Sequence, residues 1–298
     1  MPGKKVVILG GGQAAANAIR AIRNLDQNCQ VSLVSEEISL PYERPPLSKK
    51  CITGEKTLES CQFFDSKFYD DQNIELHLAR KVDLVDFQNH KLLVDKQAPI
   101  AFDQLLIATG SKNRILSIDG LAPGQILYLR TMAESQVIVN QTKTRNRVLI
   151  IGGGFIGMEL AASLTSLDKA VTVIESGAQL MGRAIPQEIA GIVQERHEHA
   201  GVRFHLDTTV SSVMSDGDSY KANLSNGDTV DFDLIIVGIG IRPNLDAFAD
   251  GDLHTDDGVV TDEYGRTSID NVYAAGDVAS FYHPVSYTHL TLPTILLV

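Results

Sequence analysis

The chain has 298 residues, of which 44% are hydrophobic and 21% are charged, and its formal net charge at pH 7 is −11. Such an acidic chain has no overall attraction to nucleic acid or to an anionic membrane, because both require concentrated Lys and Arg. No apolar run reaches the roughly 18 residues that span a bilayer, and no signal-peptide pattern precedes the first predicted strand. We therefore expect a cytoplasmic protein of two domains, since one domain has about 150 residues.

In chain order, the first predicted unit is a strand, a glycine turn, a helix, a second strand and an acid. These elements cover residues 4–9, 10–12, 13–24 and 31–34, and the acids are Glu36 and Glu37. The same order returns later, with a strand at 147–151, a turn at 152–157, a helix at 158–167, a strand at 171–174 and then Glu175. The sequence thus predicts a duplicated βαβ unit with parallel strands.

Each half continues in the same way, with an aspartate, Asp103 or Asp233, before another apolar strand. The small residues that end these strands are Ala108, Thr109 and Gly110 in the first half and Gly240 in the second. Polar hairpin signals between residues 220–224 and 229–232 fit a β-meander on the crossover. The predicted fold is α/β, with two Rossmann-like dinucleotide-binding domains, each built in three layers from a parallel sheet, helices and a β-meander.

The glycines and acids recur together for a physical reason. A glycine turn before a helix lets the backbone approach a pyrophosphate, whose charge is favoured by free N–H groups and the helix dipole. The following acid accepts hydrogen bonds from ribose hydroxyls. The turn residues are Gly10, Gly12 and Ala15 in the first copy and Gly152, Gly154 and Gly157 in the second. Alanine is small enough at the third position, and two such sites in one chain indicate a flavin enzyme that a nicotinamide reduces.

Further motifs narrow this prediction to a family. Residues 41–49 read PYERPPLSK, residues 152–159 read GGGFIGME, residues 238–244 read GIGIRPN and residues 274–279 read AAGDVA. With these motifs in this order, the chain from about residue 4 to residue 281 resembles the FAD-dependent ferredoxin and rubredoxin reductases. This branch of the pyridine nucleotide-disulphide oxidoreductases includes putidaredoxin reductase and the ferredoxin reductases of biphenyl dioxygenases. The resemblance implies a glutathione-reductase-like fold, FAD and NAD(H) as cofactors, no metal, and a small iron–sulfur or rubredoxin protein as the electron acceptor.

The resemblance also implies which residues bind FAD. They are Gly10, Gly12, Ala15, Glu36, Glu37, Arg44, Lys49, Val82, Ala108, Thr109, Gly110, Arg130 and Asp277. Glu36 would bind the adenosine ribose, Val82 would contact the adenine, and Arg130 and Asp277 would hold the flavin. Read without the resemblance, Arg44 and Arg130 fit ordinary surface ion pairs, and Val82 fits a plain strand residue.

A second set of residues would bind NAD(H), and it includes Glu159, one of two predicted catalytic residues. The set is Gly152, Gly154, Phe155, Ile156, Gly157, Glu159, Glu175, Arg183 and Gly240. Lys49 and Glu159 are the predicted catalytic residues, because a lysine cation can stabilise charge on reduced flavin and the glutamate can orient the lysine. Glu175 favours NADH over NADPH, since a carboxylate repels a 2′-phosphate. Arg183 is the counter-argument, since an arginine eight positions on could reach that phosphate.

Two other functions remain open at this point. The cysteines Cys29, Cys51 and Cys61 show neither CxxC nor CxxxxC spacing, which indicates no disulfide framework and no dithiol redox centre. A thiol-dependent NADH oxidase would still be conceivable if Cys51, just beyond the PPLSK motif, reached the flavin. A redox-sensing flavoprotein similar to apoptosis-inducing factor is the second alternative.

The predicted domain boundaries follow the duplication. Residues 1–112 and 244–284 would form the two parts of the FAD domain, and residues 113–243 the NAD(H) domain. The resemblance implies a further C-terminal interface domain, which is missing here. Residues 285–298 match the translation of a sequencing adapter, so we interpret them as a non-native read-through tail and the chain as truncated; a real apolar strand is the alternative. A truncated chain is expected to bind cofactor weakly or fold incompletely, and the sequence leaves the oligomeric state open.

Overall fold

A computed structural model describes residues 3–95, 97–182, 184–217, 219–249, 251–283 and 288–291. The chain divides into two compact units, which are described separately below. Unit 1 comprises Met1–Glu43, Gln62–Lys112 and Arg242–Val298, and unit 2 comprises Arg44–Cys61 and Asn113–Ile241. The chain passes from one unit to the other within β8 (Ser111–Asn113) and β16 (Ile241–Pro243) and on either side of residues 44–61.

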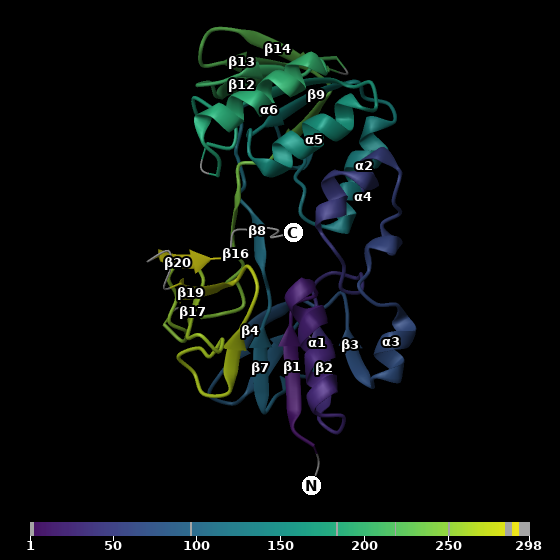
Figure 1. The fold of residues 1–298 in the computed structure, drawn as a ribbon, viewed down its shortest axis with the longest axis vertical. Helices are drawn as coiled ribbons and strands as arrows, with labels where there is room; N and C mark the ends of the chain where they lie inside the picture. Colours follow the sequence, from purple (N-terminus) through teal and green to yellow (C-terminus); the bar gives the residue numbers. More distant parts are fainter. Residues whose placement is uncertain are drawn as a thin grey trace. The chain divides into compact units, whose positions relative to one another are not determined.

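Unit 1 contains a five-stranded parallel sheet with the strand order β18-β7-β1-β2-β3 (Figure 1). The strands are β1 (Lys5–Leu9), β2 (Gln30–Val34), β3 (Ile74–His77), β7 (Gln104–Ile107) and β18 (Val272–Ala274). The chain leaves β1 on one side through α1 (Gln13–Leu25) to β2 and later returns to the other side at β7. The strand order therefore reverses at β1, and ligands of open α/β sheets bind at the carboxyl end of such a strand.

Both faces of this sheet are covered, which explains why β1 is apolar without interruption. Val7 and Leu9 belong to one core cluster, which they share with the antiparallel strands of a small sheet. Ile8 points to the opposite face, where it packs with Ala15 and Ile19 of α1. Side chains of a strand alternate between faces, and helix positions four apart share a face.

Two small sheets and one short helix complete unit 1. The first sheet consists of β4 (Val82–Asp86), β5 (Lys91–Val94) and β6 (Ile100–Ala101). The second consists of β17 (Val259–Thr261), β19 (Ala279–His283) and β20 (Thr288–Thr291). The helix is α3 (Ser66–Asp71), next to β3. In the predicted non-native tail, residues 288–291 thus pair with β19, whereas residues 285–287 and 292–298 lie outside the described residues.

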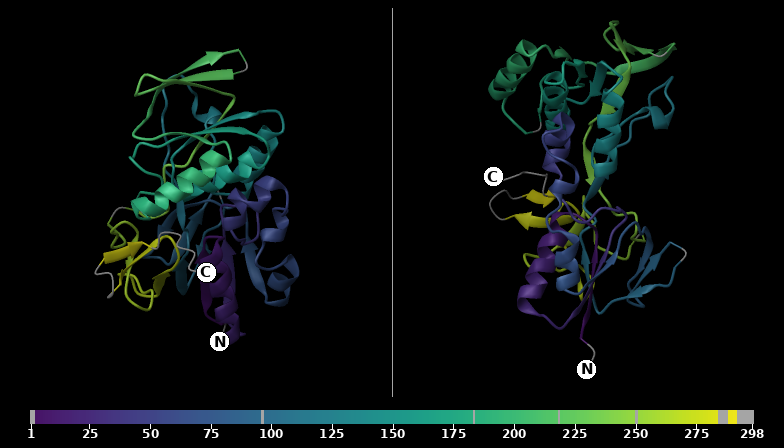
Figure 2. Two further views of the ribbon diagram at one scale, coloured as in Figure 1. Left: turned by 45° about the horizontal axis from the view of Figure 1, so that its top comes forward. Right: turned by 90° about the vertical axis from the view of Figure 1, so that its right-hand side faces the viewer.

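Unit 2 repeats this architecture with a four-stranded parallel sheet in the order β11-β10-β9-β15. The strands are β9 (Arg147–Ile151), β10 (Ala170–Ile174), β11 (Arg203–His205) and β15 (Leu234–Val237), and the helices of the unit include α5 (Phe155–Thr165) and α6 (Gln187–His199). The predicted meander is present as β12 (Val210–Asp216), β13 (Ser219–Leu224) and β14 (Thr229–Phe232). It packs on the sheet through Leu149 and Ile151. Figure 2 shows it as a layer apart from the helices.

One segment lies in a different unit from the one that the predicted boundaries gave it. Residues 44–61, placed in the first domain by sequence, belong to unit 2. They form η1 (Pro45–Ser48), α2 (Lys50–Thr53) and η2 (Glu59–Cys61), and η1 and α2 pack on α4 (Met132–Thr142) and α5. Ser135 Oγ of α4 donates to the carbonyl of Leu47 (3.0 Å), and Ser163 Oγ of α5 donates to the carbonyl of Ser48 (2.8 Å). These bonds join residues about 90 to 115 positions apart, which local sequence patterns do not encode.

Equivalent hydrogen bonds occur in the two sheets, which also have the same strand order. Gly10 N–H donates to Val34 and Gly152 N–H to Ile174, both at 2.8 Å. The repeated aspartates have equivalent places too, since Asp103 accepts from the N–H of Lys5 (2.7 Å) and Asp233 from that of Arg147 (2.9 Å). Each aspartate thus fixes the start of the central strand of its sheet.

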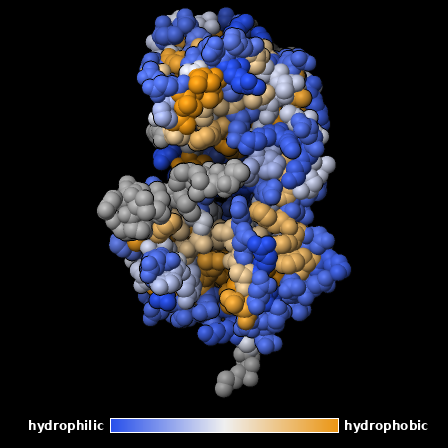
Figure 3. Space-filling model, in the orientation of Figure 1, coloured by the Kyte–Doolittle hydropathy of each residue, from blue (hydrophilic) through white to orange (hydrophobic). Residues whose placement is uncertain are grey.

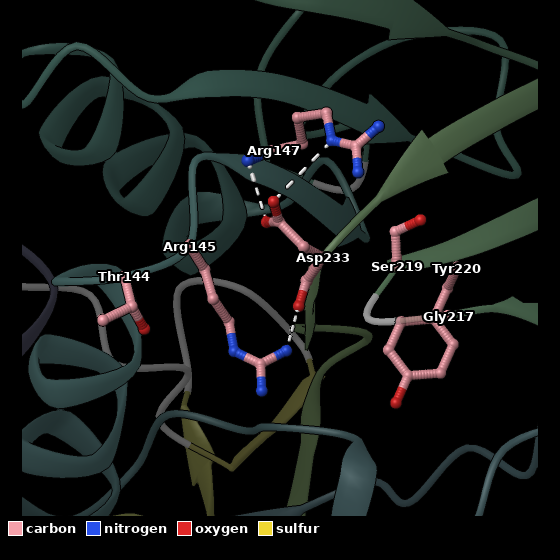
Figure 4. A pocket seen from close by; sticks show the side chains of 7 residues that line it. All are labelled: Thr144, Arg145, Arg147, Gly217, Ser219, Tyr220 and Asp233. Atoms are coloured by element: carbon pink, nitrogen blue, oxygen red, sulfur yellow. Dashed lines mark hydrogen bonds and ion pairs between the residues drawn. The ribbon is translucent and has the colours of Figure 1, made fainter.

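Figure 4 shows the surroundings of Asp233, where a polar pocket opens beside Arg145 and Arg147. The carboxylate lies 3.6 Å from Nε of Arg147, and the carbonyl of Asp233 accepts from Arg145. Because Arg147 begins β9 and Asp233 precedes β15, this pocket lies at the amino ends of the strands. It therefore lies at the opposite edge of the sheet from the glycine turn, away from the edge at which ligands of open α/β sheets bind.

The exposed surface is mixed in polarity. The face drawn in Figure 3 is mostly hydrophilic, with separate hydrophobic patches. The most exposed large apolar side chains, Leu25, Ile38 and Ile115, come from both units. Within the described part of the chain, no helix combines the length and the apolar character needed to cross a membrane.

Candidate nucleotide sites

The glycine turn of unit 1 is built so that backbone, and no side chain, occupies the switch point of the sheet. Gly10 has a φ of +123°, and a Cβ there would lie closer than 3.0 Å to the carbonyl of Ala108. Gly12 caps α1 without a side-chain hydrogen bond, and a Cβ on Gly12 would meet no atom within 4 Å. The helix thus begins beside open space at Gly12, and the first N–H groups of a helix, which have no partner within the helix, suit a pyrophosphate.

The ends of three neighbouring strands meet at this turn. Ala108 follows β7, and its N–H donates to the carbonyl of Leu9 (2.8 Å). Gly276 follows β18 with a φ of +82°, and a Cβ on it would lie 3.0 Å from the Cβ of Ala14 in α1. Asp277 is consequently held beside the start of α1, where it accepts a hydrogen bond from Ser111 Oγ (3.0 Å).

Thr109 and Gly110 complete this edge of the sheet. Thr109 Oγ1 donates to the carbonyl of Asn244 (2.8 Å), and Asn244 N–H donates back to the carbonyl of Gly110 (2.9 Å). Gly110 has a φ of +65°. The predicted FAD residues Gly10, Gly12, Ala15, Ala108, Thr109, Gly110 and Asp277 are thus brought together at one edge of unit 1.

The two acids after β2 have different surroundings. Glu37 accepts a short hydrogen bond from the hydroxyl of Tyr42 (2.5 Å), whereas the side chain of Glu36 is exposed. Glu36 is therefore the better placed of the two to accept from a ribose. Val82 is only 8% exposed and packs in the core beneath the sheet, opposite Val94. Its side chain thus has the surroundings of an ordinary strand residue.

The glycine turn of unit 2 has the same construction, with glycine also at the third position of the turn. Gly152 has a φ of +107°, next to the carbonyl of Gly238, and Gly154 caps α5 with open space around it. A Cβ on Gly157 would lie closer than 3.0 Å to the carbonyl of Gly152. The equivalent residue of unit 1, Ala15, is fully buried.

Glu175 lies beside this turn and is oriented by the backbone. Its Oε2 accepts from the N–H of Gly153 (2.6 Å), and its Oε1 accepts from the N–H of Gly177 (2.7 Å). Each carboxylate oxygen can accept more than one hydrogen bond. The fixed carboxylate therefore keeps acceptor capacity for a ribose. Arg183, predicted to lie near it, is outside the described residues.

The predicted catalytic pair is in direct contact. Lys49 Nζ lies 2.7 Å from Glu159 Oε1, and Ser48 Oγ donates to Glu159 Oε2 (2.5 Å). Glu159 lies one turn after Phe155 on the same face of α5, and the side chains of Phe155 and Ile156 are exposed at 56% and 41%. An ion pair and an apolar surface thus adjoin the turn. Ser48 is missing from the sequence prediction, although it directly precedes Lys49 in the PPLSK motif.

Arg44 and Arg130 also lie together in unit 2. Arg44 Nη1 donates to the carbonyl of Arg130 (2.5 Å), and the N–H of Arg130 donates to Glu134 Oε2 (2.7 Å) at the start of α4. Gly240 lies on another loop of the unit, with a φ of +103°, and its carbonyl accepts from the N–H of Arg114 (3.0 Å).

The residues present fit two dinucleotides, one at each glycine turn. Each turn leaves open space at its capping glycine, where a Cβ would meet no neighbour, and each is followed by an acid. In the described part of the chain, no group of three His, Cys, Asp or Glu is arranged to hold a metal ion. Fold and sites together define a protein with two dinucleotide-binding folds.

Comparison with known proteins specifies the family. Residues 4–292 match the family model described as "Pyridine nucleotide-disulphide oxidoreductase", and the chain belongs to that family. It is 33% identical to rhodocoxin reductase of Rhodococcus erythropolis, over 94% of this chain and 66% of that protein. It is 32% identical to a rubredoxin-NAD(+) reductase of Pseudomonas putida, over 97% of this chain and 76% of the relative.

A solved structure shows the same fold. The ferredoxin reductase for the CYP199A2 system from Rhodopseudomonas palustris superimposes with a TM-score of 0.91 at 33% identity, over 96% of this chain and 71% of that structure. The predicted α/β fold and the resemblance to ferredoxin and rubredoxin reductases are confirmed. The chain spans about two thirds to three quarters of the length of these relatives.

Proposed function

We propose that this chain is the nucleotide-binding part of an NADH-dependent flavoprotein reductase that delivers electrons to a ferredoxin or a rubredoxin. The observation that carries the proposal is the duplicated site, because one chain with two glycine turns and two acids suits one flavin and one nicotinamide nucleotide. The relatives are named as reductases for rhodocoxin, rubredoxin and ferredoxin, which supports a small electron-transfer protein as acceptor. We also propose that this chain acts in the cytoplasm, as expected from its sequence.

Unit 1 is the proposed FAD site. The N–H groups after Gly12 would bind the pyrophosphate, Glu36 the adenosine ribose, and Asp277 the ribityl chain. Ser111 would hold Asp277 in place through the 3.0 Å hydrogen bond. When both nucleotides are bound, their rings supply the hydride transfer, so the protein contributes position and electrostatics.

Unit 2 is the proposed NAD(H) site. Gly154 would present the helix N-terminus to the pyrophosphate, and Glu175 would accept from the ribose hydroxyls. Phe155 and Ile156 would supply an apolar surface along the nucleotide, since both are exposed beside the turn. Gly240 has no side chain to obstruct the nicotinamide end of the path.

The pair Lys49 and Glu159 is the proposed catalytic pair. Its 2.7 Å contact holds the ammonium group in one place, and Ser48 restrains the second carboxylate oxygen. The lysine side chain remains 43% exposed, so its charge is available to a ligand. We expect Lys49 to stabilise negative charge on the reduced cofactor, and Glu159 to orient Lys49.

Glu175 also supports a preference for NADH. A hydrogen bond to a charged acceptor contributes about 1.5–3 kcal/mol, which is about 10- to 100-fold in affinity. A 2′-phosphate would lose this bond and would be repelled by a carboxylate that Gly153 and Gly177 hold in place. We therefore expect NADH to bind more tightly than NADPH.

The test is made on the full chain loaded with FAD. Flavin retained after gel filtration measures the first site, and anaerobic bleaching of its absorbance by NADH or NADPH measures the second. Reduction of an added ferredoxin or rubredoxin then measures electron delivery. Lys49→Ala should slow flavin reduction. The control variant Lys50→Ala changes an exposed neighbouring lysine and should leave the rate of flavin reduction unchanged. Because weakly bound flavin is lost on gel filtration, the function would be overturned only if an equilibrium titration of the folded chain with FAD also showed no binding. Faster bleaching by NADPH would overturn the coenzyme preference.

The thiol-dependent alternative is disfavoured by the surroundings of Cys51. Its side chain is buried, at 5% exposure, and faces another cysteine. Burial raises its pKa to about 12, whereas a thiol that must react in every catalytic cycle at neutral pH needs a lowered pKa and access to solvent.

A further inference from the structure

Two cysteines that are ten positions apart in the sequence are neighbours in unit 2. The Sγ atoms of Cys51 and Cys61 lie 3.5 Å apart. Both side chains are buried, at 5% and 1% exposure. The sequence spacing suggested no dithiol, so this pair arises from the fold.

Short-range backbone bonds bring the two thiols together. Helix α2 ends at Gly54, whose φ of +80° reverses the chain. Lys56 N–H then donates to the carbonyl of Lys50 (3.0 Å), and Cys61 N–H donates to the carbonyl of Leu58 (3.1 Å). Cys51 on α2 and Cys61 on η2 are therefore held by hydrogen-bonded turns.

We propose that Cys51 and Cys61 are a site of reversible oxidation that forms an intramolecular disulfide in the presence of a peroxide. One thiolate attacks the peroxide, whose O–O bond breaks, giving a sulfenic acid and one water. The second thiol then displaces the hydroxyl as another water, and the S–S bond forms. Hydrogen peroxide is reduced to two waters, and the two thiols lose two electrons and two protons.

The geometry requires only a small movement for this reaction. A disulfide has an S–S length of about 2.05 Å, so the two sulfurs must approach by about 1.5 Å, within the range of side-chain rotation. Cys29 is a natural contrast, because its buried Sγ lies 3.3 Å from Nη1 of Arg23. Cys29 is thus a buried thiol that faces a guanidinium instead of a second thiol.

The charges around the pair determine how fast it reacts. Desolvation, the hydrogen bond to Cys61 and the nearby Glu59 raise the pKa of Cys51, while Lys56 lowers it. The net value of about 12 keeps the thiol protonated at neutral pH. Oxidation should therefore be slow in neutral solution and faster as the pH rises, because the thiolate is the nucleophile.

Oxidation would affect the segment that carries Lys49. Cys51 lies two residues after Lys49, and the segment is attached to α4 and α5 through Ser135 and Ser163. The disulfide would link α2 covalently to η2 within this same segment. This inference does not depend on the proposed function, because it requires no bound nucleotide.

The experiment treats the folded full chain with hydrogen peroxide and removes the peroxide. The chain is then unfolded in denaturant with N-ethylmaleimide, which blocks every remaining free thiol, and the peptides are mapped by mass spectrometry. We expect a crosslinked peptide joining Cys51 to Cys61, with Cys29 alkylated, and its reversal by dithiothreitol. Cys29→Ser should retain the crosslink. Cys51→Ser and Cys61→Ser should each lose it and leave the remaining thiol open to alkylation or overoxidation.

Two results would overturn the proposal. In one, Cys51 and Cys61 of the folded wild-type chain stay alkylatable or are oxidised separately to sulfinic acids. In the other, the crosslink forms only when denaturant is present during the peroxide step. Chance encounters in an unfolded chain would then account for it. Circular dichroism before and after the peroxide step shows which state was tested, and none of these readouts depends on flavin or on activity.

Discussion

The two glycines at the start of α5 should respond differently to the same substitution, alanine: one variant should lose mainly stability and the other mainly nucleotide binding. In Gly157→Ala the new Cβ would lie closer than 3.0 Å to the carbonyl oxygen of Gly152, a separation that real Cβ atoms essentially never show. The carbonyl belongs to the backbone of the turn and the Cβ is fixed rigidly to the backbone of the helix, so no side-chain rotation relieves the clash and the helix and the turn must move apart. Gly154→Ala adds the same methyl group where no atom lies within 4 Å.

The expected magnitudes follow from these surroundings. Overpacking costs up to about 3 kcal/mol, and replacing a helical glycine by alanine recovers about 1 kcal/mol. Gly157→Ala should therefore lower the free energy of unfolding by about 2 kcal/mol. Gly154→Ala should cost less than about 1 kcal/mol, the usual difference between glycine and alanine at an N-cap.

NADH binding, in contrast to stability, should be weakened mainly in Gly154→Ala. The methyl group in Gly154→Ala would occupy the space proposed for the pyrophosphate and weaken NADH binding by about 10- to 100-fold, equivalent to one charge-assisted hydrogen bond. Urea unfolding without nucleotide measures the first effect, and NADH titration of the folded variant measures the second. The reasoning fails if Gly157→Ala is as stable as the wild type, or if Gly154→Ala binds NADH normally.

Three further expectations can be checked independently. Tyr69 is fully buried, and its hydroxyl has no hydrogen-bond partner in the described part of the chain, so Tyr69→Phe should raise the free energy of unfolding by about 1 kcal/mol; a loss in urea unfolding would contradict this. Asp103→Ala removes the acceptor for the N–H of Lys5 and should lower stability by about 1.5 kcal/mol, whereas an unchanged urea midpoint would show that the bond is not needed. The rate of disulfide formation by Cys51 should keep rising between pH 8 and pH 10, because burial raises its pKa from 9.0 to about 12; a plateau near pH 8.5 in quenched alkylation assays would show a solvent-like thiol.

The sequence predicts much of this protein because its signals are local. Strand, turn and helix patterns depend on residues within a few positions, so the duplicated unit could be predicted along with its turns at Gly10 and Gly152. The meander was predicted for the same reason, since its hairpin is defined by Asn226 and Gly227. Asp103 and Asp233 were visible as a repeat, but their role in fixing the first residue of the central strand required the hydrogen-bond pattern.

The tertiary structure decided which residues distant in the chain become neighbours. It joined Ser48 to Glu159, 111 positions away, and attached residues 44–61 to unit 2 through Ser135 and Ser163. It also buried Val82 and brought Cys51 against Cys61. Such contacts depend on how whole elements pack, which is set by the summed burial of many side chains rather than by the spacing of a few. The sequence therefore determined the two glycine turns, and packing alone decided what surrounds the charges and thiols near them.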